Sequence, residues 1–395
     1  MKKAGILTAV FLVIAVLLSG CGNGWIRMVN LQNRAIVQGV GIDWDGENFQ
    51  VTMQVFSPEG SGGQTMVDAS KENARIITCT GASIAEAVEK SALNQGKEFY
   101  LGHNRIVILG WDTLDQPLDG LLSYFVNSLD SRPDVSLLAT KGKASDIISA
   151  NISQSILPAM SIENTVSNAE RNGLVEEVFL IDVLEALSQP HRGTVIPFIE
   201  TVNEEDDDEK NLRSIQIDGL GVFRQEGYVG NLTGSEVRGL LCLRDTFYGA
   251  VYTLESSVFE RAAVQLYHSN TRILPNLEGE TPTFQAEIRG EWTLTEKKLK
   301  PGCEFTEESL RELEEILEER IAAECEMAFQ KVVHEFQSDV FYLGDLVWHN
   351  QPMLWKTLRE EWPEGIADST LQCDVHAEID RTGFEGVSSK INGME

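Results

Sequence analysis

Alternation of apolar and polar residues predicts several strands. It is strictest in residues 49–55 and 371–380, where every second side chain is apolar, a period that buries one strand face and exposes the other. Residues 35–43 are rich in Ile and Val, and Asp45-Gly46 supplies turn chemistry before residues 49–55, so we expect an antiparallel pair there. Shorter apolar runs predict strands at 76–80, 105–109, 135–140, 194–199, 215–223, 228–229 and 284–292.

Helical periodicity is clearest after Thr306. Apolar residues recur there at steps of three and four positions as far as Phe336, and acidic residues suit the first turn after a Thr306 N-cap. This stripe either packs on its own sheet, which we expect, or meets a partner helix. Shorter helices are predicted at 118–126, at 181–187 and after the capping box Ser83-Ile84-Ala85-Glu86.

These elements together predict an α+β protein of several domains, with mixed and antiparallel sheets, flanking helices and a long amphipathic helix in the C-terminal domain. Residues 258–268 fit a helix or a strand equally well. We expect a signal peptide at 1–20, an N-terminal α+β domain at 22–200, a linker at 201–214 and a C-terminal region at 215–386. That region is expected to divide into parts at about 215–280 and 281–386.

The first apolar run has a different character. Lys2 and Lys3 precede an apolar stretch that ends in Leu18-Ser19-Gly20-Cys21, and this stretch is shorter than the roughly 20 residues of a transmembrane helix. The layout is that of a signal peptide, and its end resembles the lipobox of bacterial lipoproteins. The resemblance implies lipidation of Cys21, cleavage between Gly20 and Cys21, and anchoring on the outer face of the cytoplasmic membrane. The alternative is a secreted protein with a chance cysteine at its cleavage site.

Charge limits the classes of partner. The formal net charge is −29, so nucleic acid and anionic lipid head groups would be repelled. The six consecutive acids at 204–209 are interpreted as a solvated linker. A calcium site is disfavoured because the EF-hand spacing and its turn glycine are missing.

Catalytic and metal motifs are absent from the sequence. His334-Glu335 is not followed by the second histidine of the HExxH zinc motif, and no nucleophile elbow, phosphate loop or dinucleotide fingerprint occurs. With Cys21 lipidated, five cysteines remain without a CxxC pair. We interpret most of them as small buried hydrophobes and leave the pairing of Cys79, Cys242 and Cys303 open. No metal, no cofactor and no enzymatic activity are expected.

Four segments and a short C-terminal motif, in the same order along the chain, resemble one family. They are Asn33–Asp43, His103–Gly110, Gly219–Arg224 and Ser338–Gly344, followed by Arg381-Thr382-Gly383. The chain is similar in these segments to the C-subunit lipoproteins of bacterial spore germinant receptors, the Ger(x)C family.

The resemblance implies a non-catalytic, lipid-anchored receptor subunit in the inner membrane of the spore. Its partners would be an A-type subunit and a B-type membrane subunit, whose assembly or signalling it supports. His103, Asn104, Arg105 and Asp339 are candidate interaction residues. The alternatives are a solute-binding lipoprotein of an importer, which typically has repeated strand–helix–strand units in two lobes, and a hydrolase acting on the cell wall.

Overall fold

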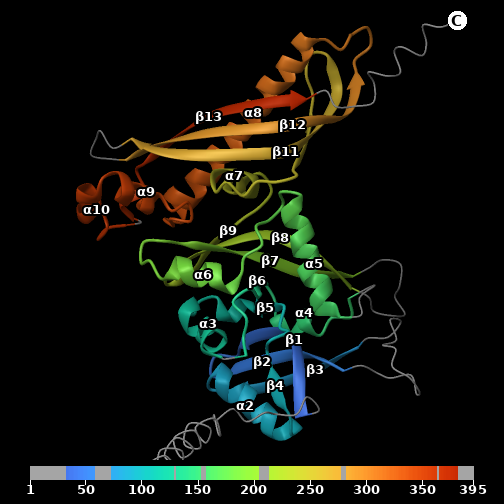
Figure 1. Cartoon of the computed structure of the whole chain (residues 1–395), viewed down its shortest axis with the longest axis vertical. Helices are drawn as coiled ribbons and strands as arrows, with labels where there is room; N and C mark the ends of the chain where they lie inside the picture. Colours follow the sequence, from blue (N-terminus) through green and yellow to red (C-terminus); the bar gives the residue numbers. More distant parts are fainter. Residues whose placement is uncertain are drawn as a thin grey trace, which may run out of the picture.

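The computed structural model describes residues 33–57, 73–128, 130–152, 157–203, 213–276, 282–362 and 364–380. Gly20, Cys21, the acidic run at 204–209 and Arg381-Thr382-Gly383 lie outside these residues. The described chain forms a nine-stranded sheet and a four-stranded sheet with helices packed on both (Figure 1). This confirms the predicted α+β class with mixed and antiparallel sheets. No helix in the described ranges is long and apolar enough to cross a membrane.

The large sheet has a parallel centre and antiparallel sides. Its order is β3-β2-β1-β5-β6-β7-β8-β9, and β4 pairs with the start of β1. The pairs within β1-β5-β6-β7 are parallel, whereas the predicted pair β1-β2 is antiparallel. The strands are β1 (Arg34–Trp44), β2 (Phe49–Phe56), β3 (Ala74–Gly81), β4 (Glu98–Tyr100), β5 (Ile106–Leu109), β6 (Ser136–Ala139), β7 (Thr194–Asn203), β8 (Arg213–Arg224) and β9 (Gly227–Leu232).

Helices cover the large sheet. They are α2 (Ile84–Gln95), α3 (Leu118–Asn127), α4 (Ala144–Ile148), α5 (Pro158–Arg171) and α6 (Leu180–Leu187). Figure 1 shows α3 and α6 to the left of the strands and α4 and α5 to the right. The predicted Ser83 N-cap is present, since its hydroxyl accepts from the Glu86 N–H at 3.1 Å. The Glu86 carboxylate accepts from the N–H of Ala82 instead of that of Ser83.

The small sheet has the order β10-β11-β12-β13. Its strands are β10 (Val251–Leu254), β11 (Phe259–Asn276), β12 (Thr283–Leu299) and β13 (Thr370–Asp380). The ambiguous segment 258–268 is therefore strand, because it forms the first half of a long hairpin with β12. The predicted alternation of β13 holds, since its polar positions are exposed while the apolar ones are buried or half-buried.

The long helix α8 (Glu307–Phe329) packs on this small sheet through its apolar stripe. Thr306 caps it as predicted and exchanges hydrogen bonds with Ser309. A π-helical turn (Gln330–Glu335) follows it directly. Helix α7 (Ser235–Leu243) crosses α8 at Gly239, where an added Cβ would lie 1.9 Å from the Glu324 carbonyl oxygen. Only glycine lets these helices approach so closely.

One hydrophobic core runs through both sheets. Strands β8 and β9 follow the acidic run in sequence, yet they extend the large sheet, and Asn203 of β7 pairs directly with Arg213 of β8. The run therefore connects two neighbouring antiparallel strands. The small sheet begins only after β9 and α7 (Figure 1).

Candidate functional site: the junction between the two sheets

The candidate residues from the sequence lie in two separate places. His103-Asn104-Arg105 leads into β5 in the large sheet, whereas Asp339 lies just before α9 (Leu343–Asn350), below the small sheet (Figure 1). His103 is exposed, and Arg105 forms an ion pair with Glu163 at 2.6 Å. Asn104 is 1% exposed, and neither atom of its side-chain amide hydrogen-bonds to a described residue. Contact of these residues with a partner remains a prediction.

Asp339 is fully buried and holds the start of α9. Its carboxylate accepts from the N–H groups of Leu343 and Gly344, both at 2.8 Å, and from the Trp362 indole at 2.9 Å. Burial raises the pKa of Asp339, and the three hydrogen bonds act in the opposite direction. The side chain therefore positions α9 from inside the protein.

Around Asp339, side chains from the two halves of the chain meet. His191 and Arg192, in the turn before β7, both contact the carboxylate of Asp345 on α9, at 3.2 and 2.7 Å. The Gly193 N–H donates to the Asp339 carbonyl at 3.0 Å. This segment ties the large sheet to the helices that lie below the small sheet.

A second ion pair crosses the same junction. Arg244, which follows α7, donates to both carboxylate oxygens of Glu176 at 2.8 and 2.9 Å and also to the Val340 carbonyl. The two side chains are only 14% and 12% exposed. Burial has the largest single effect and would lower the pKa of Arg244, but the charge of Glu176 and the contacts with Glu176 and Tyr342 together outweigh it. The pKa is therefore raised and the guanidinium stays charged.

Tyr342 lies between the two ion pairs. The guanidinium carbons of Arg192 and Arg244 lie 4.6 and 5.1 Å from its ring centroid, as in cation–π contacts. Its backbone is left-handed, with φ 58° and ψ 37°, which is costly for a bulky residue. We call Glu176, His191, Arg192, Arg244, Asp339, Tyr342 and Asp345 the junction cluster.

A groove of about 490 Å³ opens beside the junction cluster. Its walls include His191, Trp355 of α10 (Pro352–Leu358) and Trp348, which is 49% exposed. Gly344 packs against two of these wall residues, since a Cβ at this position would lie 2.7 Å from His191 Cδ2 and 2.9 Å from Trp355 Cη2. The junction leaves no room for a larger residue at this position.

The chemistry of the junction cluster is that of a structural joint. The carboxylates of Asp345 and Glu176 are paired with His191, Arg192 and Arg244, the carboxylate of Asp339 is satisfied by N–H donors, and the hydrogen bonds link segments far apart in sequence. Within the described ranges, no group of three or more His, Cys, Asp or Glu side chains could hold a metal ion. The arrangement suits a structural role, in which the junction cluster holds the large sheet and the small sheet in a fixed relative position.

Comparison with known proteins agrees with the order of the sequence motifs. Residues 27–201 match the family described as spore germination protein N-terminal domain, and residues 218–383 match the spore germination B3/GerAC-like C-terminal family. The chain belongs to the Ger(x)C family.

Similar proteins cover most or nearly all of this Ger(x)C chain. Spore germination protein B3 of Bacillus subtilis (strain 168) is 22% identical over 393 residues, which is 98% of this chain and 100% of that protein. Spore germination protein YndF of the same organism is 21% identical, over 85% of this chain and 83% of its own. The crystal structure of the GerBC protein aligns with a TM-score of 0.53 at 19% identity, covering 86% of this chain and 96% of that one, and so supports the fold.

The fourth Ger(x)C segment found in the sequence, Ser338–Gly344, forms one side of the junction cluster. The other side, made by Glu176, His191, Arg192 and Arg244, was missed. No local signal could have found it, because His191 and Asp345 are 154 positions apart and Arg244 and Glu176 are 68 apart.

Proposed function

We propose that this protein is the lipid-anchored, non-catalytic C subunit of a nutrient germinant receptor, and that it supports assembly or signalling of A-type and B-type membrane subunits. Family membership across both parts of the chain is the observation that carries the proposal. The lipobox at Cys21 supports anchoring on the outer face of the spore's inner membrane.

The junction cluster supports a scaffolding role. A subunit that holds two membrane partners needs its own parts in a fixed relation, and buried, bidentate ion pairs supply geometric specificity. The Arg244–Glu176 pair is of this kind. The hydrogen bonds of Asp339 and the contacts of His191 and Arg192 with Asp345 add further links across the junction.

The test is affinity purification of the tagged full-length protein from detergent-solubilised spore membranes, with mass spectrometry of the proteins recovered. A Cys21→Ala variant is the matched control for anchoring. We expect two specific membrane subunits, recovered in smaller amounts with Cys21→Ala. Deletion of the gene should abolish the response to one nutrient.

Two results would contradict the proposal. Recovery of an importer permease and ATPase would identify a solute-binding lipoprotein. Normal germination of the deletion strain on every nutrient tested, with no paralogue present, would exclude a required receptor subunit.

A further inference from the structure

Strand β10 forms one edge of the small sheet and turns backbone groups outward. The Leu266 N–H donates to the Ala250 carbonyl at 2.8 Å, and Val251 to Leu254 continue that antiparallel register along β11. Bonded and non-bonded pairs alternate in such a ladder, so the N–H and C=O groups of Val251 and Thr253 point away from β11. No described residue hydrogen-bonds to these outward groups.

The opposite edge of the same sheet is blocked. On β13, the N–H groups of Ala377 and Ile379 donate to the carboxylates of Glu318 and Glu314 on α8, both at 2.9 Å. Natural proteins cover sheet edges in such ways because an open edge pairs with other chains. The contrast marks the β10 edge as the one left available.

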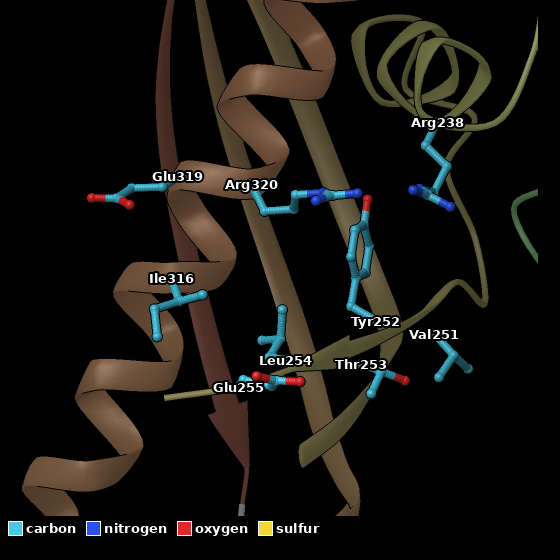
Figure 2. A pocket seen from close by; sticks show the side chains of 9 residues that line it. All are labelled: Arg238, Val251, Tyr252, Thr253, Leu254, Glu255, Ile316, Glu319 and Arg320. Atoms are coloured by element: carbon cyan, nitrogen blue, oxygen red, sulfur yellow. The ribbon is translucent and has the colours of Figure 1, made fainter. Parts of the chain in front are cut away.

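A groove of about 560 Å³ runs along this open edge. The consecutive residues 251–255 all line it, together with Ile316 and Arg320 of α8 (Figure 2). A groove over one face of a strand would be lined by alternate residues only, so it is the edge itself that borders the space. Val251 is 54% exposed there.

The two ends of the groove differ in charge. Arg238 and Arg320 share a single carboxylate, that of the buried Glu324, at 2.7 and 3.0 Å, so one positive charge is in excess beside Tyr252. Glu319 also lines the groove, but its side chain points away from Tyr252 (Figure 2). Burial has the largest single effect and acts to raise the pKa of Glu324, but the hydrogen bonds from Arg238, Tyr252 and Arg320 and the charge of Arg238 together outweigh it, so the pKa is lowered. Glu255 makes the far end negative.

We propose that the β10 edge binds an extended segment of another polypeptide chain, which adds to the small sheet as a fifth strand. Its main chain would pair with Val251 and Thr253, and an acidic side chain would face Arg238 and Arg320. This is the β-augmentation mode of peptide recognition. A second copy of this chain fits less well, because each copy carries a net charge of −29.

The experiment is photo-crosslinking in the full-length, membrane-bound protein, with p-benzoylphenylalanine in place of Val251. The same probe in place of Tyr267, which is 81% exposed on β11, is the positional control. We expect an adduct from position 251 only, and peptide mapping should place it in one extended stretch of a different chain that contains an acidic residue.

A pair of variants tests the main-chain pairing. Thr253→Pro removes the outward N–H and should lower the yield of the adduct about tenfold, since a hydrogen bond and the fit of the strand are lost together. Thr253→Val keeps the N–H and should leave the yield unchanged. Thermal unfolding of both variants checks that the fold is retained, and Arg320→Gln should lower the yield without unfolding.

Several outcomes would overturn the proposal. The first three concern the partner and position: an adduct within this chain, an adduct with a differently tagged second copy, or equal adducts from positions 251 and 267. The fourth is no adduct from position 251 although the membrane subunits co-purify. The fifth is an equal adduct yield from Thr253→Pro and Thr253→Val. Co-purification of those subunits is scored separately, so failure of the edge site is distinguishable from failure of the receptor assignment.

Discussion

Removing Arg244 should loosen the joint between the two sheets. In Arg244→Met the apolar stem is largely kept, but Glu176 loses both of its guanidinium contacts and the Val340 carbonyl loses a donor. Breaking a buried pair by deleting one partner costs about 3–5 kcal/mol, because an uncompensated charge remains. We expect a loss of that size in the free energy of unfolding at pH 7.

A double-mutant cycle isolates the pair. Glu176→Gln should cost less than Arg244→Met, because its amide oxygen can still accept from the guanidinium. In the double variant no unpaired charge is buried, so its loss should be smaller than the sum of the single losses by about 2 kcal/mol. The assay is urea unfolding followed by circular dichroism and tryptophan fluorescence.

Two results would refute this reasoning. A loss below about 1 kcal/mol for Arg244→Met would place the pair with ordinary surface salt bridges. Additive losses in the cycle would show that the two side chains do not stabilise one another. Lys298→Met is the control, since Lys298 pairs with Glu260 on the exposed surface of the small sheet and should change stability by less than about 1 kcal/mol.

Three further predictions follow from packing and charge. Gly344→Ala should destabilise the protein by about 1–3 kcal/mol through its clash with His191, measured by urea unfolding against Gly142→Ala, where the added Cβ meets open space. The pKa of Glu324 is lowered from 4.5 in the folded state, so its ionised carboxylate stabilises the fold above pH 4.5, and this stabilisation is lost as the pH falls further. In Glu324→Gln the free energy of unfolding should therefore depend less on pH on the acid side. An unchanged pH dependence would exclude a stabilising role for the ionised carboxylate. Cys325 is fully buried, so mass spectrometry should find it unmodified by iodoacetamide in the folded protein and modified in urea, and rapid labelling without urea would contradict the packing.

The buried side chain of Asn104 can be tested by substitution. Asn104→Leu removes two buried polar groups that hydrogen-bond to no described residue and keeps a similar shape, so stability should be unchanged or raised by about 1 kcal/mol. Unchanged stability with a lost germination response would support the predicted interaction at this residue. Unchanged stability and an unchanged response would assign Asn104 to the fold alone.

Local pattern predicted the elements that carry a strong period of their own. Strand β2 and strand β13 alternate strictly in sequence, and the stripe of α8 follows one helix face, so each could be placed from its own residues. The predicted exposed face of β2 was wrong, because Thr52 and Gln54 are buried in the structure as well. Segment 258–268 stayed ambiguous because its partner in the hairpin, β12, decides its conformation. Helices α9 and α10 were missed because each is short and is held by contacts from elsewhere, such as those of Asp339 and Trp355.

The candidate site was predictable on one side only. Asp339 and Tyr342 belong to a segment that resembles its family strongly enough to be seen in the sequence. Arg192 and Glu176 are ordinary charged residues until the fold brings them to the junction. When the role of a side chain depends on a partner that is distant in sequence, no local sequence pattern reveals that role.

The pairing of Asn203 with Arg213 has a practical consequence. The sheet fixes these two residues as direct neighbours, so the chain between them closes a loop whose ends are already held in place. Lengthening such a loop costs only about 0.6 kcal/mol for each doubling. An epitope or fluorescent reporter inserted at residues 206–208 would leave the sheet intact. It would allow this subunit to be followed in germinating spores without a tag at either terminus.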